Sequence, residues 1–188
     1  SKSVAMGGSN TASGDYAFAS GYDNIASGYS STAMGGNNNR ASNSYATAIG
    51  HGHLASGLYS VAMGYNCTAS GTNSVAIGGG NNATHAGAVA MGQANTASGQ
   101  YSTSLGASNQ ATAHGSFAVG QTNLASNAYA AAIGYNNGAT QRTSICLGDT
   151  CHATGAYSIA LGNNAFTNSD IRFAFGVSTS APGGSRPN

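Results

Sequence analysis

The sequence predicts an all-β protein, a parallel β-solenoid (β-roll) built from coils of 14 residues. Three observations predict this class: a glycine that returns at a fixed interval, side chains that alternate before each glycine, and a composition rich in small residues. The interval is too short for a strand, a helix and their loops, and the apolar residues lack helical spacing. We therefore expect each interval to form one coil whose strands pair with their equivalents in the next coil.

The periodic glycine closes words such as SVAIG and AVAMG, and each spacing is 14 residues except one of 15. The extra residue falls between Gly35 and Gly50, in GNNNR (36–40), which marks that spacer as a loop. The glycines are Gly7, Gly21, Gly35, Gly50, Gly64, Gly78, Gly92, Gly106, Gly120, Gly134, Gly148, Gly162 and Gly176.

Composition favours a tightly wound repeat over a disordered chain. The 188 residues include 29 Gly and only two Pro, and the net charge is +1, whereas disordered chains normally carry high net charge and many prolines. So weak a charge gives no field to attract nucleic acid or an anionic membrane. No apolar run approaches the roughly 20 residues that span a bilayer. No basic and apolar leader begins the chain, so we expect any export signal to lie outside it.

The first strand of each coil is the SVAMG-type word. Alternation places Val and Met on one face and Ser and Ala on the other, and both faces avoid water. One roll can enclose only one of them. We favour Ala and Ser inside a thin roll, with Val, Met, Ile and Leu in a contact between subunits; the reverse assignment stays open. Otherwise an apolar strip would follow the whole chain, so we expect several copies around one axis.

The second strand of each coil carries an Ala-Ser or Ala-Thr pair, such as Ala69-Ser70 or Ala83-Thr84. The residue before this Ala varies from Thr11 to Arg40 to Leu54, which is typical of a solvent-facing position. We expect this Ala to point inward. The corners are occupied by Gly or Asn, and a recurrent Asn three residues after the periodic glycine can hydrogen-bond along the stack.

Two kinds of word therefore alternate along the chain. They are NSVAIG (73–78), YSVAMG (59–64), YSIALG (157–162) and KSVAMG (2–7), and TASG (11–14, 68–71 and 96–99). This alternation closely resembles the head repeats of trimeric autotransporter adhesins, the YadA-like family, over about Ser1 to Gly176. The resemblance implies a left-handed β-roll, three chains around a threefold axis, and a stalk anchored in a bacterial outer membrane. Nothing here resembles the family's neck or stalk, so the anchor is expected outside this chain.

The resemblance implies a non-enzymatic adhesin head that forms a homotrimer and binds host extracellular matrix, or a cell-surface protein or glycan, through repetitive side walls. Its expected location is extracellular, on the cell surface attached to the outer membrane. A structural or receptor-binding fibre of a phage or virus is the alternative, and would place the chain on a virion. An ice-binding solenoid is disfavoured because the residues beside the Ser and Thr positions are too irregular.

Few residues offer chemistry. Four Asp, no Glu and no Ser-His-Asp pairing leave few general acids, so we predict neither an enzyme nor a cofactor. His53 falls in the Asn position one coil before Cys67, where the two could share a metal. No further ligand is near in the pattern, so we favour exposed turn histidines and a small Cys in place of Asn. Cys146 and Cys151 flank a corner that a disulfide could staple; alternatively Cys146 is a small core residue.

We assign residues 1–176 to one head domain of about twelve coils and 177–188 to a flexible exit segment. Residues 163–176 are interpreted as a C-terminal cap, because the charged residues Asp170 and Arg172 occur there together with Phe166, Phe173 and Phe175. A tyrosine recurs shortly before the glycine word, as at Tyr45 and Tyr59. It is either a ligand-facing row or, as is commoner, a column that covers a corner and packs on its neighbours.

Overall fold

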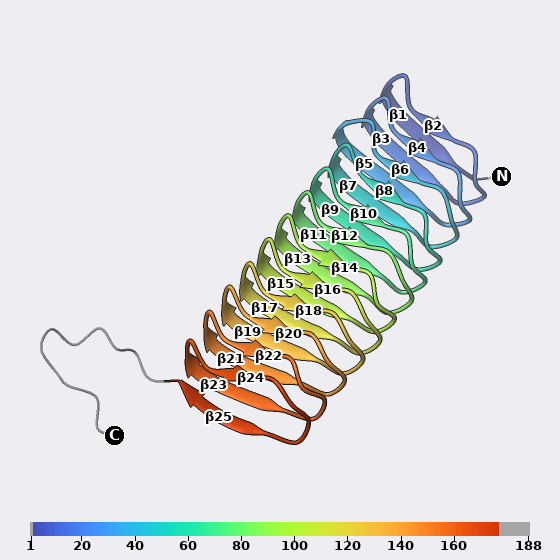
Figure 1. Ribbon diagram of the computed structural model, residues 1–188. Helices are drawn as coiled ribbons and strands as arrows, with labels where there is room; N and C mark the ends of the chain where they lie inside the picture. Colours follow the sequence, from blue (N-terminus) through green and yellow to red (C-terminus); the bar gives the residue numbers. More distant parts are fainter. Residues whose placement is uncertain (1, 177–188) are drawn as a thin grey trace, which may run out of the picture.

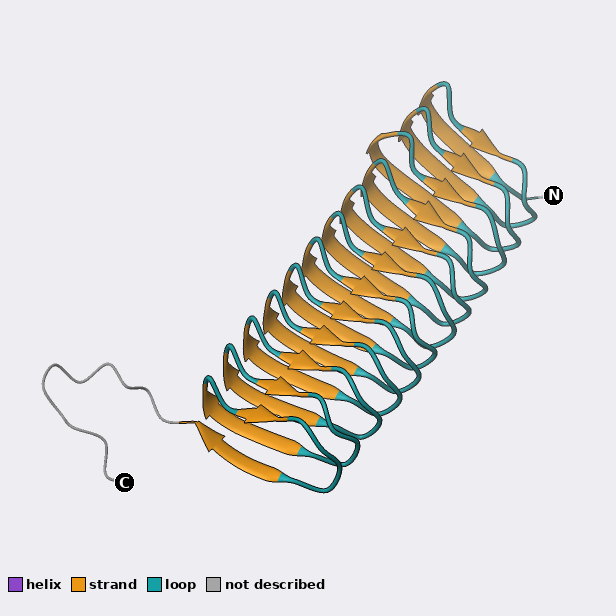
Figure 2. Ribbon diagram, in the orientation of Figure 1, coloured by secondary structure: helices purple, strands orange, loops and turns teal. Residues whose placement is uncertain are grey.

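The chain forms a straight parallel β-solenoid, seen along its length in Figure 1. The computed structural model describes residues 2–176, so the expected exit segment lies outside the described residues. Every coil contributes one strand to each of two sheets, and short corners join the strands (Figure 2). Residues 2–176 contain no helix. The solenoid predicted from the 14-residue interval is confirmed.

The first sheet has 13 strands and the second has 12. The strands of the first sheet are β1 (Val4–Gly8), β3 (Phe18–Tyr22), β5 (Thr32–Asn37), β7 (Thr47–His51), β9 (Val61–Tyr65), β11 (Val75–Gly79), β13 (Val89–Gln93), β15 (Thr103–Ala107), β17 (Phe117–Gln121), β19 (Ala131–Tyr135), β21 (Ile145–Asp149), β23 (Ile159–Asn163) and β25 (Phe173–Gly176). The strands of the second sheet are β2 (Thr11–Ala12), β4 (Ile25–Ala26), β6 (Arg40–Ala41), β8 (Leu54–Ala55), β10 (Thr68–Ala69), β12 (Asn82–Ala83), β14 (Thr96–Ala97), β16 (Gln110–Ala111), β18 (Leu124–Ala125), β20 (Gly138–Ala139), β22 (His152–Ala153) and β24 (Phe166–Thr167).

Equivalent residues of successive coils lie side by side. In the pairing of β11 with β13, for example, Val75 faces Val89 and Gly78 faces Gly92. The single longer coil changes this only locally, because the register shifts between Gly35 and Asn37 and is regular again beyond that point. The extra residue therefore forms a bulge inside the six-residue strand β5, and the prediction that it lengthens a loop is wrong, because a bulge takes up one residue while the sheet continues in register beyond it.

Small side chains fill the inside of the roll. Ala76 and Ala90 of the first sheet and Ala83 of the second are fully buried, and Ser74 and Ser102 are buried beside the strands of the first sheet. The Val and Met positions point outward. The structure thus decides between the two assignments that alternation left open. The space between the two sheets holds mainly Ala, with Ser104, Cys146 and Thr167 as slightly larger exceptions, because much larger residues there would force the sheets apart.

A ladder of asparagine amides closes the corner that follows the first strand. At its centre, Asn109 Nδ2 donates to the carbonyl oxygens of Leu105 at 2.9 Å and Gly120 at 2.7 Å. Asn109 Oδ1 accepts from the backbone N–H of Asn123 at 2.9 Å, in the next coil. Each buried amide thus satisfies backbone groups of its own coil and the next, as expected for stacked asparagines.

Replacing Asn109 with Ala should lower the free energy of unfolding by about 3 kcal/mol, because two part-buried carbonyls and one buried N–H lose this hydrogen-bond partner. Chemical denaturation followed by circular dichroism measures the change. Asn82→Ala is the matched control, since Asn82 is an exposed residue of β12, and it should stay within about 0.5 kcal/mol of the parent. Equal losses in both variants would contradict a structural role for the ladder.

Candidate interaction surfaces

The outward face of the first sheet carries an apolar strip that we call the outer stripe. It consists of the first and third residue of each strand: Val4, Met6, Phe18, Ser20, Thr32, Met34, Thr47, Ile49, Val61, Met63, Val75, Ile77, Val89, Met91, Thr103, Leu105, Phe117, Val119, Ala131, Ile133, Ile145, Leu147, Ile159, Leu161, Phe173 and Phe175. In the single chain Leu147 is 46% exposed and Met91 38%. So long a continuous strip of large apolar side chains is typical of a surface that another protein covers.

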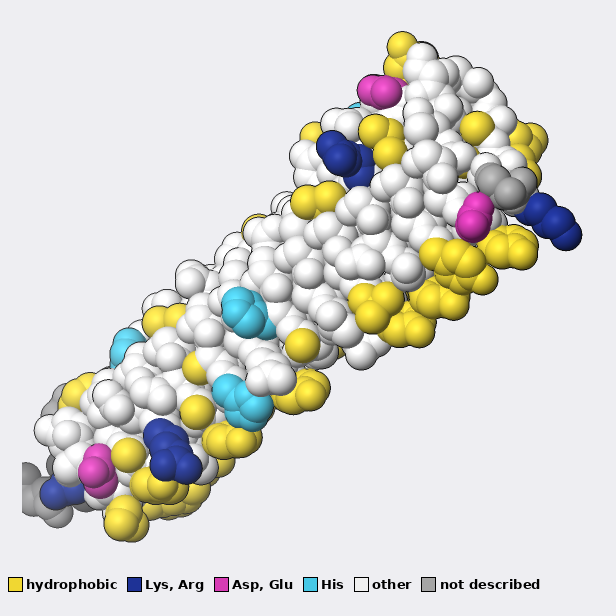
Figure 3. Space-filling view, turned by 90° about the vertical axis from the view of Figure 1, so that its right-hand side faces the viewer, with side chains coloured by type: hydrophobic (Ala, Val, Ile, Leu, Met, Phe, Trp, Pro, Cys, Tyr) yellow, Lys and Arg dark blue, Asp and Glu magenta, His cyan; other side chains and the backbone are white. Residues whose placement is uncertain are grey.

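The outward face of the second sheet, which we call the outer wall, has a different character. The residue before the inward Ala is polar at Thr11, charged at Arg40 and apolar at Leu54, and all three are exposed. The predicted inward Ala and outward variable position are both confirmed. In Figure 3 one side of the rod is mostly neither hydrophobic nor charged, and hydrophobic side chains gather in a row along one long edge.

Tyrosines form a column at the corner that leads into the first sheet. We call it the leading column: the residue two before each strand of that sheet. Tyr45 and Tyr59 stack with their ring centroids 4.9 Å apart and their planes 9° apart. Tyr16 and Tyr45 each make an edge contact of 5.6 Å with Tyr29, which occupies the preceding corner position. The column packs on its neighbours, as the commoner interpretation predicted, yet its tyrosines are 44–61% exposed.

A second set of rings was not predicted. Tyr22, His51, Tyr65 and Tyr135 occupy what we call the trailing column, the last residue of each strand in the first sheet. His51 and Tyr65 stack at 5.4 Å with 6° between their planes. The signal was present in the sequence, since each of these residues directly follows a periodic glycine. It is weak because the same column also holds Gly79, Gln93 and Ala107.

His53 and Cys67 occupy adjacent rungs of the asparagine ladder, where the sequence placed them. His53 Nδ1 accepts from the backbone N–H of Cys67 at 3.1 Å. The expectation that both turn histidines are exposed is wrong for His53, which is 1% exposed because ladder positions point into the roll. Cys67 is buried with a free thiol. Among residues 2–176, no group of three or more His, Cys, Asp or Glu could hold a metal ion.

Replacing His53 with Asn should raise the free energy of unfolding by about 1 kcal/mol. The imidazole of His53 only partly replaces the hydrogen bonds of an asparagine amide, since its buried Nε2 has no hydrogen-bond partner. An asparagine amide at this rung can donate to two carbonyls, as Asn81 does to Ile77 at 2.8 Å and Gly92 at 2.7 Å. The readout is the denaturation midpoint, and a lower midpoint than the parent's would contradict this description of the rung.

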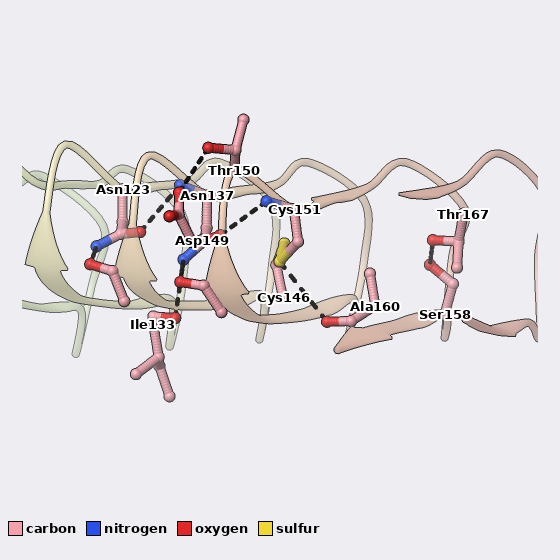
Figure 4. Close-up of a disulfide and its surroundings, with 12 residues drawn as sticks. Asn123, Ile133, Asn137, Cys146, Asp149, Thr150, Cys151, Ser158, Ala160 and Thr167 are labelled. Carbon is pink, nitrogen blue, oxygen red and sulfur yellow. Dashed lines mark hydrogen bonds between the residues drawn. A yellow bond between two sulfur atoms is a disulfide. The ribbon is translucent and has the colours of Figure 1, made fainter. Parts of the chain in front are cut away.

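Cys146 and Cys151 are joined by a disulfide inside the roll (Figure 4), with an S–S distance of 1.98 Å. Cys146 replaces the inward Ala of β21, and Cys151 stands where a ladder asparagine would be. The backbone N–H of Cys151 donates to Asn137 Oδ1 at 2.9 Å, so the ladder meets the disulfide directly. The disulfide ties the corner residue Cys151 to the first sheet. One coil earlier a hydrogen bond does the same, because Asn137 Nδ2 donates to the carbonyl oxygen of Ile133 in the first sheet.

A thiol count on the denatured chain should find one free thiol, that of Cys67, and a count of three would contradict the pairing. Changing Cys146 and Cys151 to Ala should lower the free energy of unfolding by about 2 kcal/mol, the loop-closure contribution of a short loop. Cys146→Ala with Cys151→Asn is the matched variant. It should recover most of that loss, because an asparagine there extends the ladder by one rung.

The last coil continues the sheet to its end. β25 pairs with β23, so that Ile159 faces Phe173 and Leu161 faces Phe175. Asp170 accepts a hydrogen bond from the backbone N–H of Ala156 at 2.8 Å. The function of residues 163–176 as a cap stays a prediction.

No helix in residues 2–176 could cross a membrane.

A family model described as the YadA head domain repeat (2 copies) matches the chain in nine segments, most of which overlap their neighbours, between residue 1 and residue 165. The matched segments are 1–24, 12–38, 26–52, 41–66, 55–81, 69–95, 97–123, 111–137 and 139–165. No curated protein matches the chain at a significant level.

Proposed function

Because the chain belongs to the YadA head domain repeat family, we propose that it is the head of a trimeric surface adhesin that binds host extracellular matrix or cell-surface molecules. In this proposal the head is extracellular, at the cell surface beside the outer membrane, and binds neither a cofactor nor nucleic acid. It acts by binding alone and catalyses no reaction.

The outer stripe carries the trimer proposal. Three flat rolls with their first sheets turned to a common axis would enclose the large apolar side chains that a single roll cannot. A closed ring of identical chains also leaves no stripe exposed, whereas an open arrangement would. The asymmetry between the two sheets supports this interpretation, since the outer stripe of the first sheet is mostly apolar whereas the outward positions of the second sheet vary freely between polar, charged and apolar residues.

The outer wall is where we place ligand binding. Its coils repeat one geometry, so a trimer would offer three long walls of similar, weakly charged positions. Weak contacts repeated along a rigid rod gain affinity through multivalency, by about 10²–10⁴-fold over a single contact. Recognition would lie in the irregular residues, such as Arg40, Leu54 and His152, which are all exposed.

An array of extracellular matrix proteins and cell-surface glycans tests the proposal. The parent chain should bind at least one of them, and Leu54→Asp with Leu124→Asp on the outer wall should weaken that binding at least tenfold while the mass of the assembly is unchanged. Leu124 lies five coils from Leu54, so the pair tests whether binding extends along the wall. A parent chain that assembles normally but binds nothing on such arrays would contradict the adhesin function.

A further inference from the structure

The rings of the leading and trailing columns occur in the same coils. Every aromatic residue of the trailing column lies on a strand that also has a tyrosine in the leading column. The matched pairs are Tyr16 with Tyr22, Tyr45 with His51, Tyr59 with Tyr65, and Tyr129 with Tyr135. Where the leading residue is not aromatic, the trailing residue is not either, as at Asn73 and Gly79 or at Gly115 and Gln121. Tyr101 and Tyr157 are the tyrosines without an aromatic partner.

The match extends to ring geometry. At the corner that leads into β7 and β9, Tyr45 and Tyr59 stack with 9° between their planes, while His51 and Tyr65, at the far ends of the same two strands, stack with 6°. In each stack the faces of the rings cover one another, so the edges are left to solvent. Tyr59 is 51% exposed and Tyr65 57%. Two similar ridges of ring edges therefore lie at opposite corners of the same coils.

Contact within one chain cannot explain this match. Tyr65 ends β9 and Tyr59 lies in the corner two residues before β9 begins, so the five-residue strand between them keeps the two residues about 13 Å or more apart. Stacking along a column relates residues of successive coils, and it says nothing about the opposite corner. Matched residues that cannot meet within a chain can meet between chains, if one corner of each copy faces the other corner of the next.

We propose that the leading column of each subunit packs against the trailing column of its neighbour at the same height along the rod, ring edges against ring edges. The partner is a second copy of this chain, and the inference rests on the proposed trimer. A triangle of three first sheets brings the middle of each strand to the axis and joins unlike ends at the three edges. Aromatic pairs between subunits contribute beyond the area they bury, by about 0.5–1.5 kcal/mol each.

The aromatic pairs between subunits would fix the height of one subunit relative to the next, which the outer stripe alone cannot do. The stripe is nearly the same in every coil, so two rolls could shift by one coil, about 4.8 Å, and still bury it. Such shifted contacts do not close into a ring and would build a helical filament instead. If one subunit shifts by one coil, only one aromatic pair between the subunits remains. That pair is Tyr45 with the neighbour's Tyr65 for a shift in one direction, and Tyr59 with the neighbour's His51 for a shift in the other. The irregular spacing of the rings therefore favours the closed, level trimer over shifted assemblies.

Cross-linking tests the contact. In a Cys67→Ala background, the variant Tyr59→Cys with Tyr65→Cys is treated with a short bismaleimide, because packed rings can hold the backbones farther apart than a disulfide spans. We expect a covalent species of three chains on a denaturing gel. The variant Tyr59→Cys with Gly79→Cys places the second cysteine one coil away from the matched position, and it should give at least tenfold less of the three-chain species. Tyr59→Cys alone should give no such species.

Light scattering on the same samples separates the two proposals. A parent chain of single-chain mass would refute the trimer itself. A trimeric variant that does not cross-link at 59 and 65, or cross-links equally at 59 and 79, would refute the level contact and leave the trimer standing. Tyr129→Cys with Tyr135→Cys repeats the test at β19, so a local disturbance at one pair does not decide the outcome. If neither pair cross-links in intact trimers, the inference is wrong.

Discussion

Replacing Ile77 with Asp should convert the proposed trimer into monomers that keep their fold. Ile77 belongs to the outer stripe and is flanked by Met63 and Met91 of the neighbouring strands. In the proposed assembly three carboxylates would be buried together near the axis, and unpaired charges in such surroundings cost several kcal/mol each. The coil itself tolerates the change, because the side chain points away from the Ala-filled interior. Light scattering gives the mass and far-ultraviolet circular dichroism reports the fold.

Ile77→Val is the control for this substitution, because it keeps an apolar side chain of similar shape, and it should remain trimeric. A trimeric mass for the Asp variant would show that the stripe is not the subunit contact. Loss of the β signal would instead mean that the stripe is needed within one coil, which contradicts the inward assignment of Ala and Ser.

Replacing Gly92 with Ala should be among the most destabilising single-methyl changes in the described chain. Gly92 has a φ of +114°, and a Cβ added to it would lie 2.1 Å from the carbonyl oxygen of Gly106 in the next coil. That oxygen belongs to a backbone held by the sheet, so it cannot move aside without breaking strand pairing. We expect a loss of about 4 kcal/mol or more, which lowers the midpoint of thermal unfolding by roughly 10 °C.

Two neighbouring glycines separate the causes of this loss. At Gly79 a Cβ meets nothing within 4 Å and φ is not in the left-handed range, so Gly79→Ala should be nearly neutral. At Gly80 the space is equally open but φ is +63°, so Gly80→Ala should cost about 1 kcal/mol from backbone strain alone. If Gly92→Ala were no worse than Gly80→Ala, close approach of the coils would not explain the periodic glycine.

The sequence was most informative where the structure repeats. The 14-residue interval and the inward Ala of the second strand follow from periodicity, because every coil packs in the same way. The place of the inserted residue does not, since the letters of GNNNR do not distinguish a longer loop from the bulge that forms in β5. The choice between the two faces of the first sheet could not be made in this way, since Ala76 and Ile77 are both apolar. It depends on the width of the roll, which is a property of the folded backbone.

Single departures from the repeat were harder to interpret. His53 was assigned to the surface from its residue type, although its column already placed it on the ladder, whose members point inward. The trailing aromatic column escaped notice because its residues change from Tyr65 to Gly79 to Gln93. Its aromatic residues occur in the same coils as the tyrosines of the leading column. This match can be recognised only once the structure shows where each strand begins and ends.

The mass of the native chain in solution tests the central claim most directly. Sedimentation equilibrium over a wide range of concentrations should give a species of three times the 18.3 kDa chain mass, about 55 kDa. A mass of 18.3 kDa at every concentration would contradict the account, because the outer stripe would then lie open to water along the whole rod.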